Sequence, residues 1–346
     1  MTATKNRAVR IVSSFFLATV IALLAPECNF GSQAIQPFVS NCRTDDEIPA
    51  RDRAAVDQVA IEFVKNVLGP NPEVAYSNLT VEAKGSVNPE KFVAMFKQGI
   101  QPNGPYKNLR VAHTYLAQVT GGTQEQRVVC GNLSSPKGWV AVNVKPGPGQ
   151  AHVIVEAQTL NNTWGFVTWL LPEQGNWHVQ YTQAAVTAMV GKNSEDLQQM
   201  AESEMRENHN FNAYILYAAA LQLTSRGPFL QLGIQSEIQK VLENLKRPPA
   251  LEGQPPFDWQ LGKSSYRVLN VSPIGVSQKV YLKIDHEIEP WATDKDADKK
   301  NHELISTFSS SYPEFRHAFA GVIVTAHERG GNRGFGTVSE NEGAPK

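Results

Sequence analysis

Cysteine is scarce in this chain of 346 residues, which contains only Cys28, Cys42 and Cys130. None of the three belongs to a C-x-x-C pair, which argues against a zinc site built from thiolates and against a thioredoxin-type redox site. An excess of charge of one sign is also missing, because the chain contains 32 Lys and Arg residues and 33 Asp and Glu residues. A net charge of −1 creates no field that would attract nucleic acid or an acidic membrane surface. We therefore expect no nucleic-acid partner.

Several catalytic and metal-binding motifs are absent as well. No H-E-x-x-H, G-x-S-x-G or G-x-x-x-x-G-K-[ST] pattern occurs, and no two of the eight histidines stand at H-x-H or H-x-x-x-H spacing beside a carboxylate. The glycine-rich stretch 330–336 is expected to form a hairpin turn, because a phosphate loop would lead into a helix and here a strand follows. The sequence consequently assigns no catalytic residue, no metal ligand and no cofactor.

The first 34 residues have the pattern of an export signal. Lys5, Arg7 and Arg10 form a positive start, an uncharged and mostly apolar run covers 11–25, and small residues favour cleavage after Ala34. Fifteen helical residues span about 22 Å, less than a hydrocarbon core of about 30 Å, so cleavage is favoured over a membrane anchor formed by 11–25. We expect an exported protein, either periplasmic or secreted.

Export makes a disulfide the expected use of the remaining cysteines. Cleavage after Ala34 removes Cys28 and leaves Cys42 and Cys130, which can pair in an oxidising compartment. Two free thiols are the alternative, and a retained leader would allow Cys28 to pair with Cys42 instead. Acylation of Cys28, as in a lipoprotein, is disfavoured by the glutamate that precedes it.

The apolar fraction of 41% is enough for extended cores, and the chain is long enough for two domains. Residues 35–50 are polar, contain proline and are predicted to be a linker. Within 51–190, apolar residues first recur at helical spacing, and about six runs rich in Val, Trp and Tyr then follow. Helices followed by strands predict an α+β domain in which N-terminal helices pack in a bent antiparallel sheet.

Three features of this first domain carry a family resemblance. Val56, Val59 and Phe63 line one face of the first helix, Phe92 to Phe96 forms a second apolar helix face, and 166–181 has the pattern of a closing hairpin with a tryptophan after its turn. In these features the domain resembles the cone-shaped, nuclear-transport-factor-like superfamily, which includes ketosteroid isomerase and the polyketide cyclases. The resemblance implies a cavity between helices and sheet, and a homodimer formed through the open sheet face.

The rest of the chain is predicted to hold a second, smaller domain. Residues 191–247 return to helical spacing and predict a helical hairpin with one further helix, and 248–258 is a proline-rich linker. The patterns of 259–338 predict a small α+β domain of the order β-β-α-β-β, and 339–346 is a tail.

Histidines in this second domain lie on predicted strands. His286 stands between Asp285 and Glu287, and His327 precedes Glu328. The two groups can meet across the sheet, but we expect both to be exposed strand histidines.

Side chains alternate between the two faces of a strand, and this alternation in the first domain predicts a ligand pocket between the helices and the sheet. Its expected lining residues are Asp57, Tyr76, Tyr115, His178 and Gln180. An isomerase of the ketosteroid type needs a carboxylate base and an oxyanion donor such as tyrosine in such a cavity. A register error of one residue would turn the strand residues to the other face of the sheet.

The sequence shows no dense cluster of ionisable residues, which favours a binding protein over an enzyme. We expect a non-catalytic exported protein of the bacterial envelope or secretome, which binds a small apolar ligand or an envelope protein. The alternative is an enzyme of the isomerase, cyclase or hydratase type in the cone-shaped domain.

Overall fold

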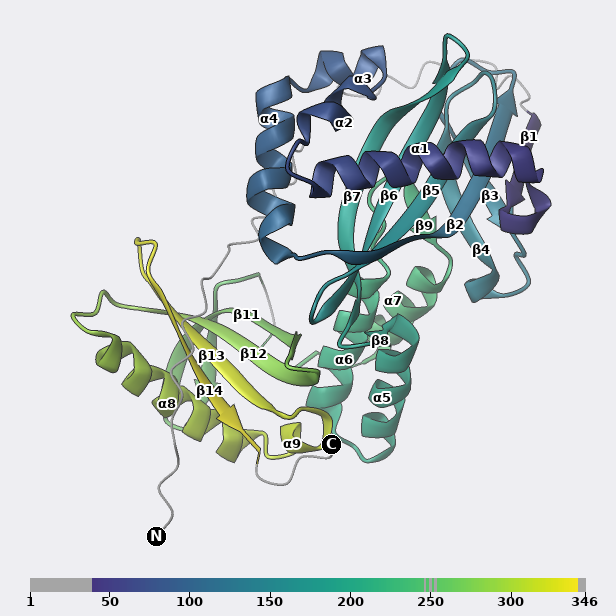
Figure 1. Ribbon diagram of the computed structural model, residues 1–346. Helices are drawn as coiled ribbons and strands as arrows, with labels where there is room; N and C mark the ends of the chain where they lie inside the picture. The colour runs from purple at the N-terminus through teal and green to yellow at the C-terminus, as the bar shows by residue number, and fades with distance from the viewer. Residues whose placement is uncertain (1–38, 246, 249–250, 252–253, 342–346) are drawn as a thin grey trace, which may run out of the picture.

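The computed structural model describes residues 39–245, 247–248, 251 and 254–341. The predicted leader, and with it Cys28, lies outside them. The described chain forms three sheets: two lie together in one half of the molecule, and the third lies in the other half beside α8 (Figure 1). No helix in the described ranges is long and apolar enough to cross a membrane.

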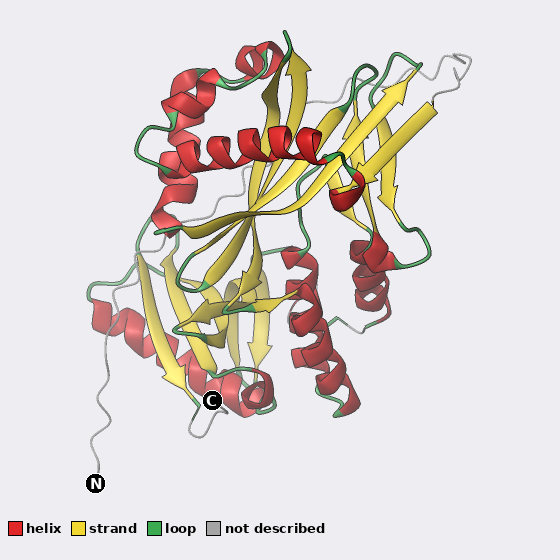
Figure 2. Ribbon diagram, turned by 45° about the vertical axis from the view of Figure 1, so that its right-hand side comes forward, coloured by secondary structure: helices red, strands yellow, loops and turns green. Residues whose placement is uncertain are grey.

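A curled, six-stranded antiparallel sheet organises the first half (Figure 2). Its strands, in spatial order, are β1 (Val39–Thr44), β2 (Lys107–Thr120), β5 (Gln150–Gln158), β6 (Asn162–Glu173), β7 (Asn176–Met189) and β8 (Lys192–Asn193). Successive side chains point to opposite faces, so Val153 joins one hydrophobic core and Ile154 joins another. Register shifts next to Trp164 and Leu170 mark bulges, which bend a sheet locally.

Helix α1 (Ala50–Leu68) lies across one face of this sheet (Figure 1). Its Val56, Ala60 and Phe63 recur at helical spacing and pack in one core with Val153 and Phe166 of the sheet. Shorter helical segments extend this layer: α2 (Glu73–Ser77), α3 (Val81–Ser86), α4 (Pro89–Ala94), η2 (Met95–Ile100) and η3 (Gln101–Asn103).

A small three-stranded sheet covers the opposite face. It consists of β3 (Gln126–Gly131), β4 (Trp139–Val144) and β9 (Leu230–Leu232). Val128, Val140 and Leu230 of this sheet pack in one core with Ile154 and Val167 of the larger sheet. Because both faces of β5 and β6 are covered, successive residues along these strands are buried.

The predicted fold class is wrong. The N-terminal helices do not pack inside a sheet that wraps them, since a helix lies on one face and a second sheet on the other. The described residues form fourteen strands in three sheets, and the predicted linker 35–50 supplies the first strand, β1. The six residues of β1, VSNCRT, show no apolar alternation, so no periodic signal marks them as a strand.

The Cys42–Cys130 disulfide expected from the cysteine count is present in the structure. It joins β1 of the large sheet to β3 of the small sheet, and Cys130 is buried in the core between the two sheets. β1 is an edge strand whose only strand neighbour within its sheet is β2. The disulfide therefore ties down a polar edge strand that has little apolar surface of its own.

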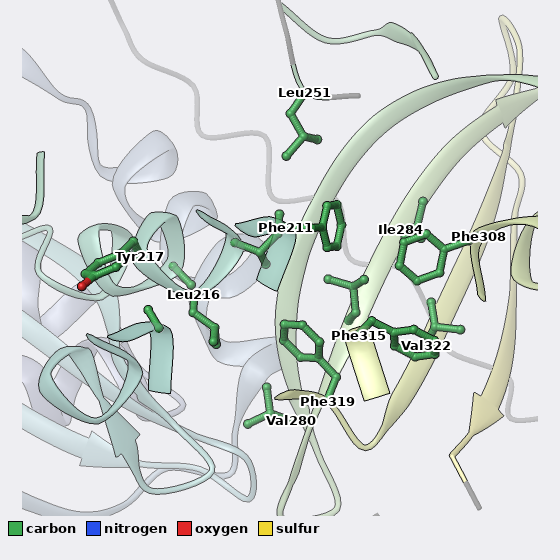
Figure 3. Packing of buried hydrophobic residues seen from close by; sticks show 14 of the residues in the cluster. Phe211, Leu216, Tyr217, Leu251, Val280, Ile284, Phe308, Phe315, Phe319 and Val322 are labelled. Carbon is green, nitrogen blue, oxygen red and sulfur yellow. The ribbon is translucent and has the colours of Figure 1, made fainter. Parts of the chain in front are cut away.

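Three helices connect the two halves of the molecule: α5 (Ser194–Arg206), α6 (Asn210–Leu223) and α7 (Ile234–Asn244). Phe211 and Leu216 of α6 share one core with Val280 and Phe319 of the C-terminal half (Figure 3). The helical segment is thus packed against the C-terminal domain. The segment 191–247 is not wholly helical, because β9 lies within it and pairs with β4. β9 was not predicted from the sequence because its three residues are too few to show the alternation of a strand.

The C-terminal half is a five-stranded sheet with α8 (Asp294–Ser311) on one face. In spatial order its strands are β10 (Phe257–Leu261), β11 (Ser264–Val276), β12 (Lys279–Ile288), β13 (Gly321–Glu328) and β14 (Gly334–Glu340), and α9 (Phe315–Ala318) precedes β13. The predicted order β-β-α-β-β missed β10, which begins inside the predicted linker 248–258. β12 and β13 run parallel, as expected when a helix connects them.

The expectation that His286 and His327 are exposed is also wrong. His286 is only 1% exposed, and its Nε2 lies 2.7 Å from Oδ1 of Asn301 on α8. His327 Nε2 lies 2.9 Å from Oδ1 of Asp285. The parallel pair β12–β13 lies at the centre of the sheet, so its residues are buried where an edge strand would be exposed.

Burial of a third histidine, His152, makes the free energy of unfolding depend on pH. His152 on β5 is fully buried, stacks on Trp169 and has its Nε2 2.8 Å from the Asn143 carbonyl oxygen. Burial lowers the pKa of His152 from 6.5 to about 4, although the Asn143 contact opposes this. The unfolded chain therefore takes up a proton first as pH falls below 6.5, and the stability present at neutral pH is lost between pH 6.5 and about 4.

We expect the free energy of unfolding to fall by about 2 kcal/mol from this group between pH 7 and pH 5. Urea unfolding of the wild type and of His152→Gln at both pH values measures the effect. The variant should lose most of that pH dependence. An identical pH dependence in the two proteins would contradict the assignment to His152.

Candidate functional site

A cleft of about 700 Å³ lies on the face of the large sheet that faces away from α1. Residues of β2 and β5 form one wall, and the other is formed by the start of β4, the end of β9 and the adjoining ends of α5, α6 and α7. The volume lies within the range of about 300–1,000 Å³ that is common for small-molecule sites. We call this site the Arg226 cleft, after the partly buried arginine that lines it.

Arg226 follows the end of α6 and lines the cleft. Its Nη1 donates hydrogen bonds to the carbonyl oxygens of Leu223 (2.8 Å) and Ser225 (2.9 Å), which hold the guanidinium in place. Within the described part of the chain, its buried Nε has no hydrogen-bond partner and the guanidinium has no carboxylate within ion-pair distance. Burial lowers the pKa of Arg226, while the charge of Glu156 opposes that shift.

The backbone next to Arg226 requires glycine. Gly227 has φ +86°, a left-handed conformation, and a Cβ there would lie 2.4 Å from Oε1 of Gln183. Thr224 closes the helix by donating a 2.6 Å hydrogen bond to the Leu221 carbonyl oxygen. The helix end and the tight turn together position the arginine at the cleft.

Three further polar side chains accompany the guanidinium. Glu156 on β5 is 20% exposed and pairs with Arg110 on β2, which is 66% exposed at the rim. Tyr115 on β2 is buried; its burial, together with the negative charge of Asp45, raises its pKa, so the phenol stays neutral. The cleft thus offers a partly buried cation and a phenol, together with the carboxylates of Glu156, Asp45 and Glu195.

Apolar side chains form much of the remaining lining. They come from both walls: Ala112, Trp139, Val140, Ile154, Leu223, Leu232 and Ile234. A ligand in the cleft would therefore contact apolar surface from both walls, polar side chains such as Gln158 and Gln198, and the Arg226 guanidinium.

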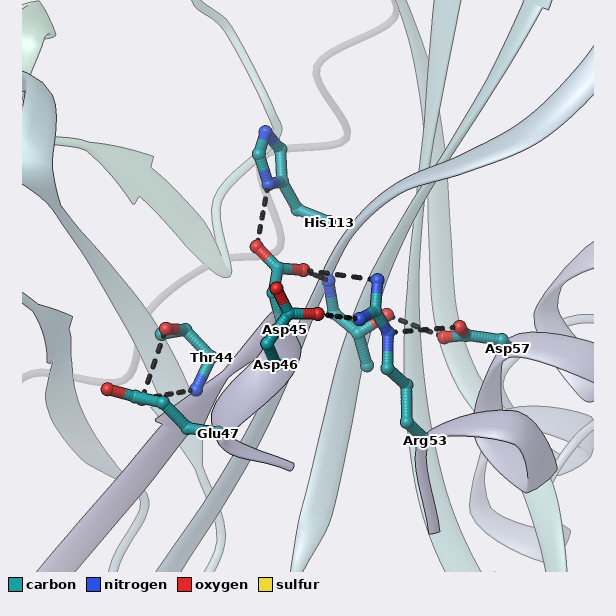
Figure 4. Close-up of polar contacts among 8 residues, drawn as sticks. Thr44, Asp45, Asp46, Glu47, Arg53, Asp57 and His113 are labelled. Atoms are coloured by element: carbon teal, nitrogen blue, oxygen red, sulfur yellow. Dashed lines mark hydrogen bonds and ion pairs between the residues drawn. The ribbon is translucent and has the colours of Figure 1, made fainter. Parts of the chain in front are cut away.

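One rim of the cleft is held by Asp45, which has φ +43° at the end of β1. Its Oδ2 lies 3.0 Å from Nδ1 of His113, and its Oδ1 accepts a 2.9 Å hydrogen bond from the backbone N–H of Thr114 (Figure 4). Arg53 lies between Asp45, Asp46 and Asp57 on the helix side of the same region (Figure 4). These contacts fasten the β1 end and α1 to β2.

Of the five residues predicted to line a pocket, only Tyr115 lines the Arg226 cleft. Asp57 lies on α1, where it accepts a 2.5 Å hydrogen bond from the Thr114 hydroxyl on the opposite face of β2. Tyr76 packs on Phe92 and donates its hydroxyl to the Val87 carbonyl oxygen at 3.1 Å.

The two residues of the closing hairpin also lie elsewhere. Gln180 accepts a 2.7 Å hydrogen bond from the Thr80 hydroxyl, beside the bridge between Leu79 and Val179. His178 is half-buried on β7 opposite Leu171. The predicted set therefore does not converge on one site.

The predicted lining lies mostly on the face of the sheet that α1 covers, whereas the Arg226 cleft lies on the other face. Between the helices and the sheet, where the cavity was expected, the space is filled by buried aromatic side chains, namely Phe63, Phe92, Phe96, Trp164 and Phe166. Sequence reasoning missed Arg226, Arg110 and Glu156, which belong to a turn and to two strands far apart in sequence. The only local signal was the Arg-Gly-Pro sequence at 226–228, which marks a turn and no chemistry.

Comparison with protein-family models, with curated proteins and with solved structures finds no match. The resemblance to the nuclear-transport-factor-like superfamily thus stays a prediction, and function has to be inferred from the geometry alone.

A second hollow, of about 870 Å³, lies in the C-terminal half between β11, β12 and α8. Its charges are largely paired with one another: Glu287 contacts Arg267 at 2.8 Å and Arg329 at 3.2 Å, and Lys300 contacts Glu303 at 2.8 Å. Because these cations already have acidic partners, the Arg226 cleft is the stronger candidate for binding a charged ligand.

Proposed function

We propose that this protein is an exported, non-catalytic binding protein that holds a small amphipathic anion in the Arg226 cleft. The observation that supports the proposal is the partly buried guanidinium of Arg226, which faces the cleft without an acidic partner among the described residues. Burying a cation without a counter-charge is costly, and such groups are usually paired.

Guanidinium geometry indicates the chemical class of the ligand. Arginine presents parallel N–H donors that match a carboxylate or a similar planar anion. Nη1 is already engaged with two carbonyl oxygens and Nε is buried, so Nη2 is the nitrogen that remains to receive the anion. The apolar lining suits a hydrocarbon or ring portion. The ligand class predicted from sequence, a small apolar molecule, is thereby refined to one with an anionic group.

Two observations support export. The N-terminal 34 residues have the pattern of an export signal, and Cys42 and Cys130 form a disulfide. Structural disulfides persist mainly in oxidising compartments, such as the periplasm and the exterior of the cell.

A displacement titration tests the binding function. The fluorescent probe is anilinonaphthalene sulfonate, an anion with apolar rings, and the competitors are decanoate, decanol and decylammonium. We expect saturable binding of one probe per chain and displacement by decanoate at much lower concentration than by the other two. Equal displacement by all three compounds would contradict a site built around a guanidinium, and absence of saturable probe binding would contradict the cleft as a ligand site.

Replacement of Glu156, a carboxylate in the cleft, should change the ligand affinity in the direction opposite to replacement of Arg226. Glu156 lies near Arg226 and offsets its charge, so Glu156→Gln should raise the affinity for decanoate. Removing one negative charge at the site corresponds to about 1 kcal/mol, or roughly fivefold in the dissociation constant. The displacement titration measures this change. Unchanged or weaker binding by the variant would place the anion away from Glu156.

An isomerase-type activity is the second candidate, because Glu156 and the neutral phenol of Tyr115 line the same cleft. A carboxylate base with a hydrogen-bonding phenol is the pair that proton transfer next to a ketone requires. Against this role, Glu156 is engaged by Arg110. Incubation with a β,γ-unsaturated ketosteroid tests the isomerase activity. Turnover by the wild type that disappears in Glu156→Gln supports this activity, and lack of turnover by the wild type contradicts it.

A further inference from the structure

Two histidines, one from the helical segment and one from the C-terminal domain, meet at the junction between these two parts. His209 precedes the first residue of α6, and His317 lies on α9, close to the turn between α5 and α6 (Figure 1). Their ring centroids are 4.7 Å apart. The junction is also fixed by Asn212, which donates a 2.7 Å hydrogen bond to the Glu314 carbonyl oxygen.

A carboxylate completes a set of metal-ligand atoms. Glu207, His209 and His317 each place one donor atom within 4.8 Å of the donor atoms of the other two. Zinc–nitrogen and zinc–oxygen bonds of about 2.0–2.2 Å place the ligands of a tetrahedral site about 3.3–3.6 Å apart. The required movement is small, and Glu207, at 56% exposure, has room to turn toward the two rings.

A buried glutamate orients one of the imidazoles. Glu204 is 7% exposed, and its Oε2 lies 2.9 Å from Nδ1 of His209 and 2.7 Å from Nδ2 of Asn212. Glu207 Oε2 lies 3.6 Å from the same Nδ1. When Glu204 accepts the Nδ1 proton, Nε2 carries the lone pair that a metal needs, and the Glu207 side chain turns toward it. Carboxylate–histidine–metal arrangements of this kind fix the ring and raise the basicity of the ligand nitrogen.

We propose that Glu207, His209 and His317 bind a divalent transition-metal ion such as Zn²⁺, with Glu204 as a positioning residue. Imidazole and carboxylate ligands suit this class of ion. Three protein ligands leave a fourth position for water, and Glu207 and His317 are exposed, so the ion can enter from solvent. The bound ion connects the helical segment to α9 of the C-terminal domain, at a site separate from the Arg226 cleft.

Calorimetric titration of the metal-free full chain with Zn²⁺ tests the site. We expect one ion per chain. His209→Gln and His317→Gln should each weaken Zn²⁺ binding by more than about 100-fold, since loss of a ligand costs more than the 10- to 100-fold that is typical for an outer partner. His317→Gln keeps the test valid if His209→Gln does not fold, because His317 is exposed.

The matched control is His302→Gln. His302 is also an exposed histidine beside a carboxylate, with Nδ1 3.4 Å from Oδ1 of Asp298 on α8, but among the described residues it belongs to no group of three possible metal ligands. This variant should bind Zn²⁺ like the wild type. The proposal is overturned if no stoichiometric binding occurs, if both histidine variants bind like the wild type, or if the control loses binding equally.

Cobalt distinguishes the positioning role of Glu204 from a purely structural one. Glu204→Gln should bind Co²⁺ about 10- to 100-fold more weakly while keeping one ion per chain, and its visible absorption bands should shift because the ring is oriented differently. Affinity and spectrum identical to those of the wild type would remove Glu204 from the site.

Discussion

Replacement of Arg226 by methionine is expected to weaken the binding of an amphipathic carboxylate by about 2–5 kcal/mol, which is roughly 30-fold or more in the dissociation constant. Arg226 is partly buried and has no carboxylate within ion-pair distance among the described residues, so an anion in the cleft receives a charge-assisted hydrogen bond from it in a poorly solvated place. Methionine is similar in length and is unbranched, and it removes the charge without removing the apolar stem.

The displacement titration with anilinonaphthalene sulfonate and decanoate measures this loss. Arg110→Gln is the matched comparison within the cleft, and it should have a smaller effect because Arg110 is 66% exposed and already paired with Glu156. Arg316→Gln is the control outside the cleft, since Arg316 lies over the ring of Phe315 on α9, and it should bind like the wild type. If Arg226→Met keeps wild-type affinity, the anion does not bind at this guanidinium.

Removal of the disulfide is expected to lower the free energy of unfolding by about 2–5 kcal/mol. Cys42 and Cys130 are separated by 88 residues, and closing a loop of that size restricts the unfolded chain considerably. In the folded state the bridge also holds β1, a polar edge strand with one strand neighbour in its sheet. The melting temperature should therefore fall by roughly 10 °C.

Urea unfolding of the double variant Cys42→Ser, Cys130→Ser measures the change, with and without reductant. Reductant should destabilise the wild type and leave the double variant unaffected, which separates the disulfide from other effects of the reductant. A double variant as stable as the oxidised wild type would show that β1 pairing does not depend on the bridge.

Some of the structure follows from short-range patterns. Val56 and Phe63 recur at helical spacing before Gly69, and α1 occupies that range. The hairpin of β6 and β7 was expected from the turn at Gly175 and the alternation around Val179. These features depend on interactions between residues close in sequence, and these are the interactions that periodicity and turn chemistry report.

The parts that were missed depend on contacts distant in sequence. β1, β9 and β10 are short or polar, and each is held by pairing with a partner strand. The face that carries the cleft is set by α1, which uses the apolar side of β5 and leaves Tyr115 on the other side of the sheet. Arg226 comes from a turn about 70 residues beyond Glu156, so no sequence spacing links them.

The most direct test is a crystal structure of the protein soaked with decanoate. We predict density for the ligand in the Arg226 cleft, with its carboxylate about 2.7–2.9 Å from Nη2 of Arg226 and its chain along Ile154 and Leu223. Decanoate bound elsewhere, or lying in the cleft with its carboxylate away from Arg226, would contradict the proposed function.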